Sequence, residues 1–190
     1  QKADFIGWHQ FNFLFKIDIL GRIKDGGTLL LNTHYSKDEV WDHLPKVVQE
    51  AILDKHLKVY VIDAYEVADK AHMGARINTV MQTCFFKLSS VMDTEEAIGE
   101  IKKAIVKTYS KKGQEIVDNN IKAVDDALNY LFEVKYPNKV TSDIKMENKI
   151  PADAPEFVKN FTAKLIAGRG EEIKVSEMPV DGRFPTGTTQ

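Results

Sequence analysis

Three short runs of strand-forming residues alternate with segments of helical periodicity, and this alternation limits what the chain can fold into. The runs lie at residues 3–8, 28–32 and 57–63, and the third is rich in β-branched and aromatic residues. Strands that are separated by helices pair in parallel, because a helix must carry the chain back to the same end of the sheet. We therefore expect an α/β fold with three layers, in which a mostly parallel open sheet is flanked by helices.

Helical periodicity and capping residues mark the segments around these runs. Ser36 and Glu39 form a capping box that opens a short helix before Pro45, and Thr94 with two glutamates starts another. Gly26-Gly27 is expected to end the first helix in a left-handed cap. The helices expected in this way cover residues 11–23, 36–44, 47–52, 64–71, 77–88 and 94–109, and a last one that begins near residue 117 and stops near Tyr136-Pro137.

Composition excludes several classes of protein. The apolar content of 43% and the charged content of 28% are ordinary for a globular domain. The formal net charge of -2 provides no broad basic field, so nucleic acid is not an expected partner. No apolar run approaches the roughly 20 residues that a membrane-spanning helix needs, so no membrane partner is expected either.

Cys84 is the only cysteine of the chain. A single thiol forms no internal disulfide and cannot supply the four thiolates that an iron–sulfur cluster normally takes. A reducing compartment is the simplest interpretation, so we expect a cytoplasmic location. Cys84 falls on the apolar face of its helix, where a small buried side chain is far more common than a reactive thiol.

The motifs of the common α/β enzymes are missing. The chain contains no G-x-G-x-x-G turn, no Walker phosphate loop and no G-x-S-x-G elbow, and its five histidines are not at metal-ligand spacing. His9 and His34 do follow expected strands, on the side where open sheets bind ligands. His9 could contact a ligand or make only a local hydrogen bond. Asp63 could be catalytic or could cap the following helix. We expect no catalytic residue and no metal ligand in this chain.

The segment from Met73 to Leu88 combines a core face with a polar edge. Apolar residues recur along it at helical spacing, which predicts that one side is buried. Asn78 and Gln82 are four residues apart and so share one column of the other side. Arg76 stands at the expected helix start, next to free backbone N–H groups. Arg76, Asn78 and Gln82 are therefore the candidate residues for binding a cofactor or a partner; idle surface amides are the alternative.

The pattern of strands and helices ends near Pro137. We expect an α/β domain over residues 1–136 and an extended linker or arm over residues 137–190, with one short helix near residues 156–166. The chain has no initiator Met and ends in Gly187-Thr188-Thr189-Gln190. These ends suggest a segment of a longer protein.

Successive segments of the sequence resemble one known family. The chain contains, in order, Lys2-Ala3-Asp4-Phe5-Ile6, Gly26-Gly27-Thr28-Leu29-Leu30-Leu31-Asn32, Leu57-Lys58-Val59-Tyr60-Val61-Ile62-Asp63-Ala64, a run from Arg76-Ile77-Asn78 to Phe86, and Lys107-Thr108-Tyr109-Ser110-Lys111-Lys112-Gly113. These segments resemble the gamma-type third domain of pyruvate:ferredoxin (flavodoxin) oxidoreductase. The segments beginning at Pro151 and Pro179 resemble the connector to the next domain of the single-chain enzyme, so the resemblance covers essentially all of the chain.

The resemblance implies a function for the longer protein. The family cleaves pyruvate with thiamine diphosphate, Mg2+ and [4Fe-4S] clusters, uses coenzyme A as cosubstrate, and passes electrons to ferredoxin or flavodoxin. The expected partners are the other domains of the same polypeptide, the electron carrier and a second copy in a homodimer. The gamma domain is associated with coenzyme A access and with domain packing, so a fragment alone should be inactive.

The family's phosphate-side loop, of the form G-S-D-G-T-V-G-A-N, is absent from this chain. That absence leaves open whether the chain binds coenzyme A alone, although Arg76, Asn78 and Gln82 remain the expected contacts. A free-standing scaffold or interaction domain without a cofactor is the alternative function.

Overall fold

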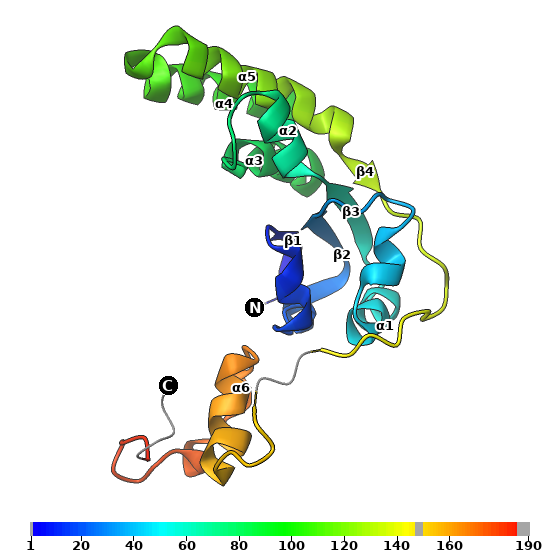
Figure 1. Ribbon diagram of the computed structural model, residues 1–190, viewed down its shortest axis with the longest axis vertical. Coiled ribbons are helices and arrows are strands. Elements are labelled where there is room, and N and C mark those ends of the chain that lie inside the picture. Colours follow the sequence, from blue (N-terminus) through cyan, green and yellow to red (C-terminus); the bar gives the residue numbers. More distant parts are fainter. Residues whose placement is uncertain (1, 147–149, 186–190) are drawn as a thin grey trace.

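A four-stranded, mostly parallel sheet forms the centre of the computed structural model, which describes residues 2–146 and 150–185 (Figure 1). The strands are β1 (Ala3–Trp8), β2 (Ile23–Asn32), β3 (Lys58–Ile62) and β4 (Phe132–Glu133), in that order across the sheet. The first three pair in parallel and β4 is antiparallel to β3. The expected α/β class with a mostly parallel open sheet is confirmed.

Both faces of the sheet are covered, because successive side chains of a strand point to opposite sides. Leu29 and Leu31 of β2 pack with α1 (Lys46–Asp54) and the neighbouring 3-10 turns. Leu30, between them, packs on the opposite face with α2 (Ala64–Lys70), α3 (Asn78–Ser89) and α5 (Gln114–Ala127). The end of β2 is therefore apolar without polar alternation because both faces of the sheet are buried there.

The helix expected over residues 11–23 is not present. Two 3-10 turns, Phe11–Phe15 and Leu20–Arg22, occupy that segment, and β2 begins at Ile23 rather than near residue 28. Gly26 has the expected positive φ, of 71°, but it lies within β2 instead of capping a helix. The pairing with β1 jumps there from Ala3↔Ile23 to Phe5↔Thr28, and Gly26 N donates to the Lys55 carbonyl. The glycine thus allows an irregularity of the strand.

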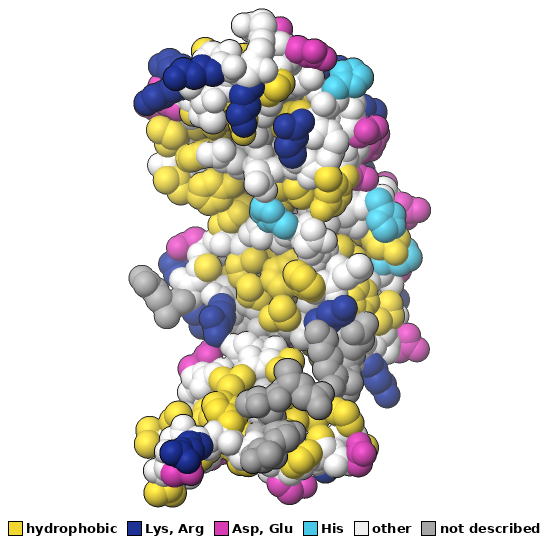
Figure 2. Space-filling model, turned by 60° about the vertical axis from the view of Figure 1, so that its left-hand side comes forward, with side chains coloured by type: hydrophobic (Ala, Val, Ile, Leu, Met, Phe, Trp, Pro, Cys, Tyr) yellow, Lys and Arg dark blue, Asp and Glu magenta, His cyan; other side chains and the backbone are white. Residues whose placement is uncertain are grey.

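The end of the helical half also differs from the expectation. The last long helix, α5, ends at Ala127, and a 3-10 turn at Leu128–Tyr130 leads into the short strand β4. Two strand residues are too few for periodicity to reveal them. α4 (Thr94–Tyr109) packs against α3 and α5 and forms a hairpin with α5 that projects from the body (Figure 1). Lys and Arg side chains gather over this end of the molecule (Figure 2).

Residues 137–146 run along α1 rather than projecting freely. The buried Gln49 holds them: its Nε2 donates to the Trp41 carbonyl, and its Oε1 accepts from Thr141 N at 2.8 Å and Ser142 N at 3.0 Å. Beyond them lies a π-helical turn at Val158–Thr162 that continues into α6 (Ala163–Ile166), close to the short helix expected. Residue 1 and residues 186–190, which include both ends of the chain, lie outside the described residues.

None of the described helices is long and apolar enough to cross a lipid bilayer.

Candidate functional site

The carboxyl ends of β1, β2 and β3 meet at one edge of the sheet, and buried Asn32 organises this edge. Its Nδ2 donates to the His9 carbonyl at 3.0 Å, and its Oδ1 accepts from Ala64 N at 2.9 Å. One side chain thereby satisfies backbone groups of the segments that follow β1 and β3. The same edge is where open parallel sheets bind ligands.

Asp63, for which two roles were open, caps α2. Its Oδ1 accepts from Glu66 N at 2.9 Å, which is the usual contact of a helix N-cap. This contact accounts for an acidic residue directly after β3 without a catalytic role. The sequence could not separate the two interpretations, because both place an aspartate at a strand end.

Two hollows open side by side at this edge. One, of about 360 Å³, is lined by His9, Gln10, Phe11, Asn12, Phe15, Asn32, Thr33, His34, Tyr35, Asp63 and Tyr65. The other, of about 320 Å³, is lined by Thr33, His34, Tyr35, Ser36, Lys37, Asp38, Val61, Ile62, Asp63, Glu66, Tyr130 and Phe132. The segment after β2 separates them, because His34 and Tyr35 line both. Their lining of rings, amides and hydroxyls suits a ligand with both planar and polar parts.

Tyr35, which lines both hollows, belongs to an aromatic stack. The Tyr35 ring lies 3.7 Å from the His43 ring, nearly parallel to it, and 4.1 Å from the tilted His34 ring. Nearby Glu39 is fully exposed. Its pKa is lowered first by the hydrogen bond from Ser36 Oγ, at 2.6 Å, and further by the backbone of Ser36 and by the two histidines. The sequence pattern pointed to His34 but not to Tyr35, although the place of Tyr35 just after β2 was a usable signal.

The predicted site residues Arg76, Asn78 and Gln82 lie together at the start of α3, away from both hollows. All three side chains are exposed, and helical spacing places Asn78 and Gln82 in one column. Arg76 Nε donates to the Met73 carbonyl at 2.9 Å, which ties the side chain to the turn before α3. Gly74 has a φ of 59° in this turn, and it provides the conformation that a sharp entry into α3 needs.

Cys84 lies on the buried face of α3, as its spacing predicted. Burial raises the pKa of its thiol to about 12, so a metal-binding thiolate is disfavoured. Within residues 2–146 and 150–185, no group of three or more His, Cys, Asp or Glu side chains is placed to hold a metal ion. A single buried thiol does not fit an iron–sulfur cluster, which normally takes four thiolates.

Two family models match the chain. One, described as pyruvate ferredoxin/flavodoxin oxidoreductase, matches residues 1–130. The second, described as a domain of unknown function, matches residues 143–190. The first match includes the whole sheet except β4, together with both hollows up to Tyr130 and the start of α3.

Curated relatives match over the full length of the chain. A pyruvate-flavodoxin oxidoreductase of Rhodospirillum rubrum is 51% identical, and one of Trichormus variabilis is 49% identical. A pyruvate:ferredoxin oxidoreductase of Moorella thermoacetica is 40% identical. In each case the match covers 100% of this chain but only 16% of the relative. The chain thus spans about a sixth of the length of these relatives.

The fold is shared with a subunit of known structure. The crystal structure of pyruvate oxidoreductase subunit PORC from Thermotoga maritima superposes with a TM-score of 0.53 at 18% identity. The superposition covers 70% of this chain and 66% of that subunit. At this level of identity the likeness concerns the fold alone.

Proposed function

The chain belongs to the pyruvate ferredoxin/flavodoxin oxidoreductase family, and on this premise we propose that it works as a segment of a longer enzyme. That enzyme would convert pyruvate and coenzyme A to acetyl-CoA and carbon dioxide. The two electrons released would pass to ferredoxin or flavodoxin. The observation that carries the proposal is identity of up to 51% over all 190 residues to enzymes with these names, in a match that takes up 16% of their length.

The cofactors of the longer enzyme would be held by its other parts. Thiamine diphosphate with Mg2+ would supply the chemistry of pyruvate cleavage, and [4Fe-4S] clusters would carry the electrons. The single buried thiol of this chain does not fit a cluster, and the proposal gives this chain no catalytic group. We further propose that the longer enzyme is cytoplasmic and homodimeric.

The proposed contribution of this chain is to bind on the coenzyme A side and to pack against other domains. Coenzyme A carries several phosphate charges, and an arginine at a helix start is suited to bind such a group. Arg76 is held at the start of α3 by its Nε contact, and no partner of its two terminal guanidinium nitrogens is recorded in the described part of the chain. The exposed amides of Asn78 and Gln82 would add hydrogen bonds beside it.

A binding titration tests this assignment. The longer enzyme is titrated with coenzyme A as the wild type and as Arg76→Ala. Losing a hydrogen bond from a charged donor is expected to weaken binding by about tenfold or more. Lys87→Ala removes the same charge near the other end of α3 and should leave the affinity unchanged. Equal affinity of Arg76→Ala and the wild type would remove Arg76 from the site.

A reconstituted assay tests the enzyme-level proposal. The longer protein, with pyruvate, thiamine diphosphate, Mg2+, coenzyme A and a viologen dye, should reduce the dye. This chain alone should not. Reduction of the dye by this chain without any other polypeptide would contradict the proposal.

A further inference from the structure

Apolar side chains are unusually exposed in the C-terminal part of the chain. Val175 and Val180 expose 86% and 107% of their reference areas, and Met178 between them exposes 53%. Leu165, Ile166 and Phe184 are also exposed, so half of the large apolar residues that this structure leaves in solvent lie between positions 165 and 184. Apolar side chains are visible over the lower part of the molecule in Figure 2. Such a concentration indicates an interaction surface.

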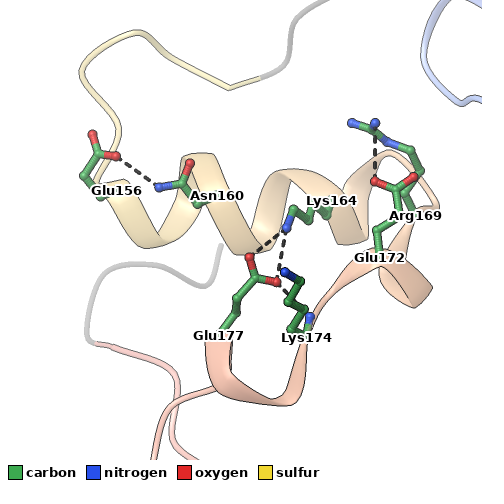
Figure 3. Close-up of polar contacts among 7 residues, drawn as sticks. All are labelled: Glu156, Asn160, Lys164, Arg169, Glu172, Lys174 and Glu177. Carbon is green, nitrogen blue, oxygen red and sulfur yellow. Dashed lines mark hydrogen bonds and ion pairs between the residues drawn. The ribbon is translucent and has the colours of Figure 1, made fainter.

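The charged side chains of the same region pair mainly with one another (Figure 3). Lys164 Nζ contacts the Glu177 carboxylate at 3.0 Å, and Arg169 lies 3.6 Å from Glu172. Backbone N–H of Lys174 also donates to Glu177, at 2.8 Å, and lowers the pKa of that carboxyl. Since these charges neutralise one another, attraction to a nucleic acid or to anionic lipid headgroups is not favoured.

Residues 150–185, called here the docking segment, have little core of their own. Phe161 is the one buried side chain among them, and it packs with Phe157 and Phe184. Segments below about 40 residues rarely bury enough surface to fold alone without a disulfide, a metal or a partner. The segment therefore depends on a surface outside itself.

The rest of this chain provides only part of that surface. Arg22 Nη2 donates to the Gly168 carbonyl at 2.7 Å and pairs with Glu171 at 3.1 Å. Beside this contact a hollow of about 520 Å³ separates α1 and residues 14–21 from Ala167 and Arg169. The contact thus holds the middle of the docking segment, at Gly168 and Glu171, and leaves Val175, Met178 and Val180 uncovered.

We propose that the docking segment binds an apolar face of another domain of the same longer polypeptide through Val175, Met178 and Val180. This inference rests on the proposed function only in requiring a longer polypeptide. The relatives support that occupant, because each matches this chain over its full length, docking segment included, and is about six times longer. A second copy of this chain would be the occupant only if the contact formed without those other domains.

Thiol labelling measures whether the surface is covered. Val180→Cys is placed both in this chain alone and in the longer protein, and labelling by N-ethylmaleimide is followed by mass spectrometry on the peptide that carries residue 180. The native Cys84 is buried and should label slowly. We expect residue 180 to label at least about tenfold more slowly in the longer protein than in this chain alone. Asp153→Cys, on an exposed polar position of the same segment, is the matched control and should label equally in both.

Each outcome has one meaning. Fast labelling of residue 180 in both proteins, or equal protection of residues 153 and 180, would overturn the inference. Protection in this chain alone that grows with its concentration would assign the surface to a second copy and would also overturn it. Met178→Cys repeats the measurement in case the substitution at 180 perturbs the contact. Dye reduction measured on the same samples separates the two proposals, because an active enzyme with an accessible residue 180 contradicts only the docking surface.

Discussion

Asn32 is the residue on which the geometry of the carboxyl edge depends. Its amide joins the end of β1 to the start of α2 through two hydrogen bonds in a buried position. The backbone groups that it serves lie 23 and 32 positions away in the sequence. Since both hollows are lined by residues around these contacts, their shape is tied to this side chain.

Replacing Asn32 with Leu, which has the same number of side-chain heavy atoms, should destabilise the fold by removing hydrogen bonds. The change leaves the His9 carbonyl and the buried Ala64 N–H without their partner, and an unpaired buried group costs about 1–3 kcal/mol. We expect the free energy of unfolding in urea to fall by about 2 kcal/mol or more. Asn138→Leu, at an exposed position, is the control and should have little effect. Equal stability of the two variants would contradict the role given to Asn32.

Cys84 should behave as an inert thiol. Burial raises its pKa from 9.0 to about 12, so at pH 8 the folded thiol carries about a thousandfold less thiolate than the unfolded one. Labelling by Ellman's reagent should be correspondingly slow in the folded chain and fast in 6 M guanidinium.

The same shift has a consequence for stability. A raised pKa contributes stability that is complete below about pH 9 and is lost as the pH rises toward 12. Cys84→Ser should lose this dependence. Rapid labelling of the folded chain at pH 8 would show that the thiol is accessible.

At the scale of elements, Gln49 joins α1 to the segment that follows β4. Both ends of its amide are used inside the protein, by the Trp41 carbonyl and by the backbone of residues 141 and 142. Tyr136 extends the attachment: its ring stacks on Trp41 and its hydroxyl donates to the Leu57 carbonyl at 2.6 Å. Residues 137–146, the first part of the expected arm, therefore form a strap that is bound to the domain.

Gln49→Leu should release this strap. The substitution removes the acceptor for two backbone N–H groups, and hydrogen exchange at residues 141 and 142 should rise by about tenfold or more. Gln114→Leu is the control, because its amide donates only to exposed Asp118. Unchanged exchange at residues 141 and 142 would show that the strap is held by other contacts.

The turn at Val175–Glu177 should be sensitive to acid. Glu177 has a pKa lowered from 4.5, first by the hydrogen bond from Lys174 N and then by Lys164. A lowered pKa contributes stability that is present above pH 4.5 and is lost as the pH falls through the folded value. Hydrogen exchange at Lys174, corrected for its intrinsic pH dependence, should therefore rise below pH 4.5. Glu177→Gln should show no such transition, and a transition of equal size in that variant would contradict the assignment.

At the scale of the whole molecule, the stability of the fold should reside in the residues before the docking segment. The sheet and the clusters on both of its faces lie within residues 3–136, and the docking segment adds an exposed ion pair of Arg22. Ending the chain at residue 146 should change the free energy of unfolding of the remaining domain by less than about 1 kcal/mol.

A shorter truncation is the matched control. Ending the chain at residue 137 also removes Thr141 and Ser142, the partners of buried Gln49, and should cost clearly more. Both values come from urea unfolding followed by tryptophan fluorescence. Equal losses in the two truncations would mean that the strap contributes nothing to the domain.

The sequence alone determined the fold class, most helices and the core face of α3. These features depend on local periodicity, capping residues and apolar runs, which are readable along the chain. The resemblance of successive sequence segments also pointed to the family that the comparisons show. Cys84 and the start of α3 were placed correctly because each depends on its near neighbours.

The features that join distant residues became apparent only from the packing of the folded chain. The irregularity at Gly26 depends on Lys55 and on pairing with β1, the strand β4 depends on β3, and the strap depends on Gln49. The hollows beside Tyr35 likewise combine the ends of separate strands. Local propensity does not predict such contacts, because the free energy that selects them arises only when remote segments pack together.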